Sequence, residues 1–201
     1  MRYTLAILVM LPLYGAAQQK NAFILSSTLF QSNARYHHGK YSAGASTLRE
    51  FDVAYLRQLD KYRVWFAGAG AGFRKVAFNR FNGQRLMDEH YLHQSVSARA
   101  VLRYERFLGR RMKYFFEGGP GYNFQGWLRA TDELDEEVQA GRALNGFFIA
   151  GKFGFQYSFN DNLALGAALS TSHDLEPSFS LFDRSWKFYS TVFSSGLRFN
   201  F

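Results

Sequence analysis

The last part of the chain alternates between apolar and polar residues with a period of two. One set of alternate positions is mainly aromatic or aliphatic: Tyr189, Thr191, Phe193, Ser195, Leu197, Phe199 and Phe201. The positions between them are mostly small or polar: Ser190, Val192, Ser194, Gly196, Arg198 and Asn200. Because successive side chains of a β-strand point to opposite faces, this pattern predicts a two-faced strand over residues 186–201.

Similar alternation recurs along the chain and predicts eight strands. We expect them at residues 22–31, 46–59, 62–75, 91–107, 113–127, 146–159, 163–172 and 186–201. Their polar faces carry charges, such as Arg99, Arg103 and Glu105 in the fourth strand, which are hard to place in an apolar core. The apolar faces are therefore expected to point outward into lipid, and the polar faces into a barrel lumen.

Three local signals predict details of the sheet. Asp60-Lys61 is a candidate two-residue hairpin turn, which would place Tyr62, Val64 and Phe66 on the outward face. The small residues at 67–72 indicate a close approach of neighbouring groups in a narrow interior. Pro120 lacks the N–H group that a strand ladder uses, so a bulge or bend is expected there.

The connections between the expected strands alternate in length. Polar loops are expected at residues 32–44, 76–88, 130–145 and 173–184, and the third contains a helix with Thr131 as its N-cap. Outer-membrane barrels have an even number of strands, short periplasmic turns and longer extracellular loops. The pattern therefore predicts an all-β fold: an eight-stranded antiparallel up-and-down transmembrane β-barrel with four longer extracellular loops and three short periplasmic turns.

The N-terminal segment has the features of a secretory signal peptide. Residues 1–17 contain Arg2, an apolar run over residues 5–13 that is too short to span a bilayer, and the small residues Gly15-Ala16-Ala17. We expect cleavage of this segment and a barrel domain over residues 18–201. The sequence has no Cys, which excludes a disulfide framework and an acylated lipoprotein cysteine. The expected location is the cell outer membrane.

The charge of the chain indicates an anionic partner at the membrane surface. The formal net charge is +8, but Lys and Arg are scattered singly, so a nucleic-acid partner is not expected. Anionic lipopolysaccharide is the expected partner in the outer leaflet, together with membrane lipid. We assign Arg74, Lys75, Arg80 and Arg85 to contacts with its phosphates, because these residues fall near the expected outer rim.

The end of the chain, Leu197-Arg198-Phe199-Asn200-Phe201, and the eight-strand pattern together resemble the small outer-membrane barrel proteins of the OmpA/OmpX type. The resemblance covers residues 18–201. It implies folding by the outer-membrane assembly machinery, with Leu197, Phe199 and Phe201 as the assembly signal. It also implies a barrel too narrow for an open channel, since side chains fill the interior of such barrels.

The inward faces of the expected strands carry charges of both signs. These residues are Glu50, Asp52, Arg99, Arg103, Glu105, Glu117, Lys152 and Arg198. Because buried charges are tolerated when they are paired, we predict a ladder of ion pairs that plugs the lumen. The alternative is a wetter pore in which the same charges are solvated, and such a pore would conduct small solutes.

One enzymatic alternative depends on a short motif. His93 and Ser95 have a His-x-Ser spacing that resembles outer-membrane lipid A deacylases, with Ser95 as nucleophile, His93 as base, and Glu105 or Glu89 orienting the imidazole. Both residues are expected to face the lumen, whereas an enzyme that acts on lipid needs them at the membrane side. This alternative is therefore ranked below a non-enzymatic role.

Neither a metal nor a cofactor is expected. Asp88, Glu89, His90 and His93 do not have a known ligand spacing, and neither does His37-His38. The expected function is a non-enzymatic outer-membrane β-barrel with a plugged polar lumen. Its role would be structural, or it would interact with a protein partner through the extracellular loops. One form of the second role is that of an accessory subunit of a secretion or assembly complex. The alternatives are the deacylase-like enzyme and a small-solute channel.

Overall fold

The computed structural model describes residues 21–38, 41–62, 64–82, 85–131, 142–181 and 184–201. The strands in this part of the chain are β1 (Asn21–His38), β2 (Tyr41–Gln58), β3 (Trp65–Asn82), β4 (Arg85–Phe107), β5 (Met112–Thr131), β6 (Arg142–Ala143), β7 (Gly146–Ser158), β8 (Leu163–Asp174), β9 (Phe179–Leu181) and β10 (Arg184–Asn200). Within the described residues, no helix is long and apolar enough to cross a membrane.

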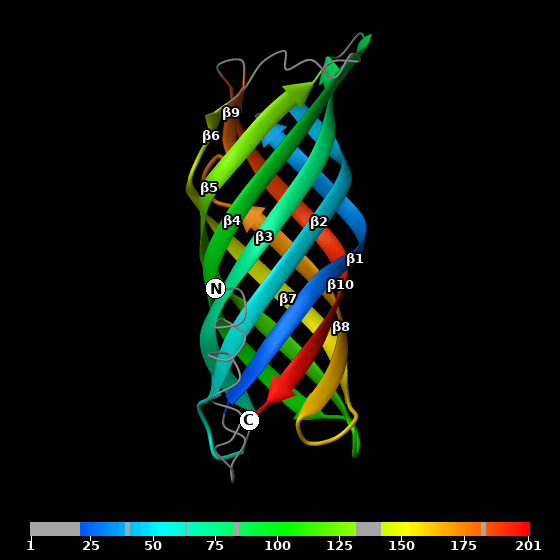
Figure 1. Cartoon of the computed structure of the whole chain (residues 1–201), viewed down its shortest axis with the longest axis vertical. Coiled ribbons are helices and arrows are strands. Elements are labelled where there is room, and N and C mark those ends of the chain that lie inside the picture. Colours follow the sequence, from blue (N-terminus) through cyan, green and yellow to red (C-terminus); the bar gives the residue numbers. More distant parts are fainter. Residues whose placement is uncertain (1–20, 39–40, 63, 83–84, 132–141, 182–183) are drawn as a thin grey trace, which may run out of the picture.

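Eight of these strands close into an antiparallel barrel (Figure 1). They pair in the order β1, β2, β3, β4, β5, β7, β8, β10, and β10 pairs with β1 to close the sheet. Beside this seam, Asn21 and Phe201 exchange backbone hydrogen bonds of 3.1 and 3.0 Å. The short strands β6 and β9 pair with each other, and β9 pairs with the start of β10. The predicted eight-stranded antiparallel barrel is confirmed. We call the end that holds Asn21 and Phe201 the terminal end, and the opposite one the far end.

Alternate residues along the strands face outward and inward. The outward aromatic and aliphatic side chains of β7, β8 and β10 are 37–52% exposed. They include Phe147, Ile149, Phe153, Phe155, Tyr157, Leu165, Leu169, Tyr189, Phe193, Leu197 and Phe199. The residues between them, such as Gln156, Ser170 and Arg198, are buried inside the barrel. A closed sheet that exposes an apolar surface and encloses charged groups is suited to lipid, so these strands are transmembrane.

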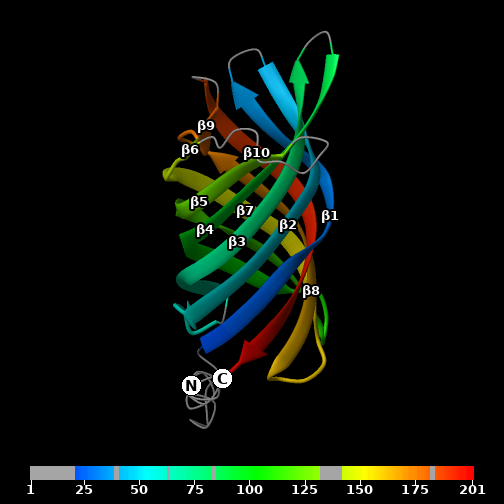
Figure 2. The same ribbon diagram turned by 45° about the horizontal axis from the view of Figure 1, so that its top comes forward.

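The first four strands are longer than the sequence pattern predicts. β1, β2 and β3 have 18 residues each and β4 has 23, whereas about 9–11 residues suffice for a transmembrane strand. The long loops predicted at residues 32–44 and 76–88 are therefore wrong. Their polar residues continue the strands as far as the pairs His38–Tyr41 and Asn82–Arg85, because pairing within each hairpin satisfies the backbone groups. Figure 2 shows both hairpins rising above the rest of the sheet at the far end.

The other two predicted loops also contain strand residues. β5 continues to Thr131, and β8 continues to Asp174. β6 lies within the predicted loop at residues 130–145, and β9 lies within the one at residues 173–184. The helix predicted from Thr131 falls mainly on residues 132–141, which lie outside the described residues.

The turn between β2 and β3 is organised by Asp60. Its carboxylate accepts hydrogen bonds from the backbone N–H groups of Tyr62, Val64 and Trp65 at 3.2, 3.0 and 2.8 Å. These bonds lower the pKa of the Asp60 carboxyl below its ordinary value, and the bond from Trp65 has the largest effect. The two-residue turn predicted at Asp60-Lys61 is wrong, because this carboxylate stabilises a longer turn.

The longer turn changes the register of β3. Gln58 pairs with Phe66, so even-numbered residues of β2 lie opposite even-numbered residues of β3. Phe66 consequently faces the lumen and is only 4% exposed, while Trp65 faces outward and is 43% exposed. The predicted outward position of Phe66 is wrong, since a change of one residue in register moves a whole strand to its other face.

The bulge predicted at Pro120 is absent. β5 pairs Pro120 with Ile149 of β7, and the β4–β5 register is the same on both sides of this residue. In an antiparallel pair only alternate residues exchange hydrogen bonds with a given neighbour, so one missing N–H group does not shift the register. The irregularity between β4 and β5 instead lies between Gln94 and Val96.

Candidate functional site in the barrel interior

An apolar layer fills the interior at the terminal end. Its members are Ala22, Ile24, Ala54, Leu56, Phe66 and Val101. Leu56 is completely buried, and the guanidinium of Arg198 lies over the ring of Phe66 at 4.7 Å from its centroid. A cation over an aromatic face is an attractive arrangement, so this contact links the apolar layer to the charged residues beside it.

A network of ion pairs crosses the middle of the barrel. The carboxylate of Asp52 lies 2.7 Å from Arg99 Nη2 and 2.9 Å from Lys152 Nζ. Glu117 uses one oxygen for Arg99 at 2.8 Å and the other for Arg103 at 3.0 Å. The five side chains are at most 17% exposed. They come from four strands, so the network ties opposite walls of the barrel together.

The network extends toward the terminal end through Glu105. This carboxylate lies 2.7 Å from Arg103 Nε and 3.4 Å from Lys113 Nζ, and it also pairs with Arg198. Arg103 donates a further hydrogen bond to Gln156 Oε1 at 2.8 Å. Each carboxylate of the network therefore has more than one cationic partner. Removing one charged side chain would leave the remaining buried charges of the network unbalanced, which is costly in a low-dielectric interior.

Two glycines of β3 leave room for the network. A Cβ atom on Gly70 would lie 3.1 Å from the Val53 carbonyl oxygen and 3.4 Å from Arg99 Nε. A Cβ atom on Gly72 would lie 3.0 Å from Ser97 Oγ and 3.6 Å from the Asp52 carboxylate. The small residues of this strand thus allow the close approach that a narrow interior requires.

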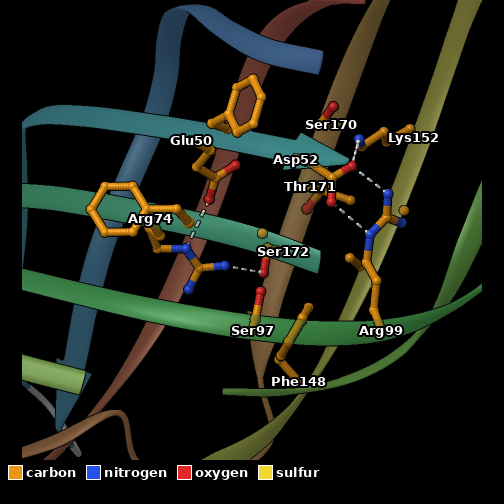
Figure 3. A pocket seen from close by; sticks show the side chains of 15 residues that line it. Glu50, Asp52, Arg74, Ser97, Arg99, Phe148, Lys152, Ser170, Thr171 and Ser172 are labelled. Carbon is orange, nitrogen blue, oxygen red and sulfur yellow. Dashed lines mark hydrogen bonds and ion pairs between the residues drawn. The ribbon is translucent and has the colours of Figure 1, made fainter. Parts of the chain in front are cut away.

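A cavity lined by charged and hydroxyl side chains among apolar ones lies on the far side of the network (Figure 3). It encloses about 500 Å³ of space not filled by atoms, including a solvent-open part, and Ser97, Ser170 and Ser172 are among the inward residues of its wall. Arg74 Nε donates to Glu50 Oε1 at 2.8 Å, and Arg74 Nη2 donates to the hydroxyl of Ser172 at 2.9 Å. Across the cavity, Arg99 and Lys152 meet at Asp52. Hydroxyl groups beside paired charges make this a site suited to ordered water.

A second apolar cluster closes the interior beyond the cavity, and we call it the aromatic cap. Its members are Ala34, Tyr36, Leu48, Val76, Phe78, Tyr91, Leu128, Phe188 and Val192. Tyr36 and Phe188 are completely buried, and the Tyr36 ring lies 4.9 Å from that of Phe188 and 4.6 Å from that of Phe78. The Tyr36 hydroxyl forms a hydrogen bond of 2.9 Å with His93 Nδ1. The buried phenol is therefore satisfied within a tightly packed layer.

The structure places all eight residues of the predicted ladder inside the barrel. Seven of them belong to the ion-pair network, whereas Glu50 pairs with Arg74 at the cavity. Gln156 was predicted on the same inward face as Lys152, and it is buried. Sequence reasoning missed Lys113 and Asp174 as interior residues. Lys113 shares strand parity with the predicted inward residue Glu117, so the alternation could have found it. Asp174 lay beyond the predicted end of its strand.

The assignment of Arg74 to a lipopolysaccharide contact is wrong. Its side chain is buried, and its guanidinium binds Glu50 and lies 3.7 Å from Asp174. The error follows from the predicted register of β3, which placed even-numbered residues outside. Lys75 faces outward and is exposed. The side chains of Arg80 and Arg85 lie outside the described part of the chain, so their assignment stays a prediction.

The residues of the deacylase alternative are not brought together. His93 and Ser95 share the interior face of β4 and are 3% and 4% exposed. Glu105 lies ten residues further along the strand, about 33 Å away at the usual rise per residue, and its carboxylate binds Arg103. The side chain of Glu89 is outside the described residues. Within that same part of the chain, no three His, Asp or Glu side chains gather as ligands for a metal ion.

The residues of the predicted assembly signal lie at the terminal end. Leu197 and Phe199 face outward, with exposed fractions of 40% and 37%. The ring of Phe201 stacks on that of Phe23, with 5.5 Å between the centroids. These residues therefore complete the apolar outer surface at the seam of the barrel, and their role in assembly stays a prediction.

Comparisons with known proteins identify the fold. No protein-family model matches the chain, and no curated protein sequence matches it significantly. A major outer membrane protein from Thermus thermophilus is 12% identical with a TM-score of 0.53, over 90% of this chain and 99% of that one. Neisserial surface protein A is 9% identical with a TM-score of 0.51, over 92% and 99% of the chains. OprG from Pseudomonas aeruginosa is 12% identical with a TM-score of 0.51, over 90% and 96%.

At such low identities the likeness concerns the fold alone. It agrees with the features of this chain itself, which are a closed eight-stranded sheet, an apolar exterior and a charged interior. The predicted resemblance is confirmed at the level of the fold: the chain has the fold of the small outer-membrane β-barrel proteins.

Proposed function

We propose that the protein is a non-conducting, non-enzymatic barrel that holds the β1–β2 and β3–β4 hairpins at the cell surface for an interaction. In this proposal the terminal end faces the periplasm and the far end faces the outside. The termini and the short turns then lie on one side of the membrane, which is the usual arrangement of outer-membrane barrels.

The main support for a non-conducting barrel is that side chains fill the interior at three successive levels. Leu56 in the terminal layer, Glu105 in the network and Tyr36 in the aromatic cap are each at most 1% exposed. A hydrated ion would have to pass all three levels. Eight-stranded barrels have interiors just wide enough for side chains, so little space remains beside these groups.

Planar-bilayer recording of the full chain tests this closed state. We expect no steady current at moderate voltage, because the ion pairs and the aromatic cap occupy the lumen. An open porin reconstituted in the same way checks that the bilayer reports conductance. Steady open-channel current from the folded protein would overturn the proposal in favour of a small-solute channel.

The length of the first four strands supports a role at the surface. About half of an 18-residue strand is enough to cross the bilayer, so the remainder of β1, β2 and β3 extends the wall beyond the lipid. Paired strands present a firmer surface than a free loop, since their backbone groups are hydrogen-bonded. We propose that this surface binds a protein partner. That partner could be part of a larger secretion or assembly complex, of which this chain would be an accessory subunit.

Deletion of residues 80–89 tests the surface role. The deletion shortens the β3–β4 hairpin while leaving the barrel below the pair Asn79–His90 unchanged. We expect the full chain, crosslinked in cells and purified in mild detergent, to retain a stoichiometric partner that the shortened chain loses. Absence of such a partner from the full chain, or equal retention by both chains, would contradict the interaction role.

A further inference from the structure

The charges of the barrel wall are sorted by sign. In the strands, every acidic side chain that the structure describes faces the interior: Glu50, Asp52, Glu105, Glu117 and Asp174. The outward charged side chains in the same part of the chain are all basic: Arg35, Arg49, Arg57, Lys75, Arg106, Arg129 and Lys187. The described outer wall of the strands is therefore positive wherever it is charged, and none of its described side chains supplies a counter-charge.

Two of these cations are direct neighbours. Arg49 of β2 is paired with Lys75 of β3, and both side chains are exposed. Side chains directly opposite each other in an antiparallel pair have Cβ atoms about 5 Å apart, and like charges in this arrangement repel. No acidic side chain of the described outer wall offsets the repulsion. A bound anion would turn the unfavourable pair into a favourable site.

The register extends this pair into a row across four strands, which we call the basic row. Lys75 pairs with Gln94 of β4, and Gln94 pairs with Trp127 of β5. Gln94 lies between the buried His93 and Ser95 and therefore points outward, and Trp127 is 51% exposed. Tryptophan and long basic side chains are typical of the level where lipid chains meet headgroups.

The next outward row toward the terminal end is entirely apolar. It consists of Phe51, Phe73, Val96 and Phe124, paired in that order. The exposed fractions of Phe51 and Phe73 are 49% and 41%. The change from apolar to basic thus occurs within a single step of the alternation, which marks the boundary of the hydrocarbon layer on this side of the barrel.

We infer that the basic row binds a phosphate monoester on the head of an outer-leaflet lipid. This inference rests on the orientation given under the proposed function. Arg49 and Lys75 supply two charge-assisted donors, and the Gln94 amide supplies a third. The acyl chains of the same lipid lie against Phe51 and Phe73. A phosphate monoester carries more negative charge than the phosphodiester of an ordinary phospholipid, and two adjacent cations match it better.

Binding of lipids with different phosphate groups tests the site. The probes are bisphosphorylated lipid A, fully dephosphorylated lipid A, phosphatidylglycerol and free inorganic phosphate, each measured by native mass spectrometry of the full chain in detergent. We expect bisphosphorylated lipid A to bind the wild type most tightly. The double variant Arg49→Gln/Lys75→Gln should lose about tenfold or more of this affinity, because both charged donors are gone.

The matched control is Arg57→Gln/Arg106→Gln, which removes two outward cations near the terminal end that do not face each other across strands. It should retain the wild-type affinity. Equal binding by the wild type and the Arg49→Gln/Lys75→Gln variant would overturn the inference, as would equally tight binding of phosphatidylglycerol, dephosphorylated lipid A or free phosphate. Bilayer conductance is recorded separately, so a conducting wild type would refute the closed barrel without bearing on this site.

Discussion

The ion-pair network and the aromatic cap occupy the same barrel, but their surroundings are opposite in polarity. Around the network, the wall is apolar outside and charged inside, as Phe73 and Arg99 illustrate. Around the cap, the wall is polar outside and apolar inside: Arg49 and Lys75 are exposed, while Leu48 and Val76 are at most 4% exposed. The comparison shows that one continuous sheet serves two solvents, lipid around the network and water near the far end.

The inversion has a simple physical origin. A strand places alternate residues on each face, whatever solvent it meets. Where lipid surrounds the wall, the outward residues must be apolar and the interior can hold paired charges. Where water surrounds it, the outward residues can be polar, and burial of the inward ones contributes hydrophobic stabilisation as in a soluble protein. Loss of a charge and loss of an apolar group should therefore have different costs in the two regions.

The largest effect is expected from Glu117→Gln. This change leaves Arg99 and Arg103 buried without the carboxylate that bridges them, so the free energy of unfolding should fall by about 3–5 kcal/mol. Urea unfolding in lipid vesicles, followed by tryptophan fluorescence, measures it. Asp161→Asn in the exposed turn before β8 is the control and should be nearly neutral. A cost below about 1 kcal/mol for Glu117→Gln would mean that water, rather than ion pairs, compensates these guanidinium groups.

A smaller effect is expected from Leu48→Ala in the aromatic cap. The substitution opens a cavity within the aromatic cap and should lower the free energy of unfolding by about 2–3 kcal/mol. Thr47→Ala changes the neighbouring outward residue and serves as the control in the same unfolding measurement. If both substitutions cost the same, the far-end interior is not packed as a hydrophobic core and the contrast between the two regions fails.

The smallest effect concerns Asp60, which belongs to neither region. Its pKa lies below the ordinary 3.8, because its carboxylate accepts backbone hydrogen bonds, of which the one from Trp65 has the largest effect. The turn is therefore stabilised at every pH above the ordinary value, and this stabilisation is lost as the pH falls through the lowered pKa. We expect the amide NMR signals of Tyr62, Val64 and Trp65 to shift together with a midpoint below 3.8.

Asp60→Asn provides the matched control for this titration. The amide side chain can still accept a hydrogen bond through its oxygen but does not ionise, so the common shift should disappear. A midpoint at or above the ordinary aspartate value in the wild type would show that the carboxylate does not hold the turn in solution.

The sequence pattern was sufficient to predict the strand number, the antiparallel closure and most inward charges. It was insufficient near the far end, because the prediction assumed apolar residues outside along the whole strand. At Lys75 and Val76 the polarity of the two faces exchanges, so a continuing strand was interpreted as a loop. The register of β3 was also missed. It depends on three hydrogen bonds to Asp60, which no alternation of residues encodes.

The sharp step from Phe51 and Phe73 to Arg49 and Lys75 also sets how deep the barrel sits. A shift of the barrel away from the cell would expose the two rings to water, and a shift toward the cell would bury both cations in the hydrocarbon layer. Either displacement is opposed after only a few ångströms. The protein should thus keep a fixed depth in the membrane on this side. The β1–β2 and β3–β4 hairpins, and any partner bound to them, would then stay at a constant height above the membrane surface.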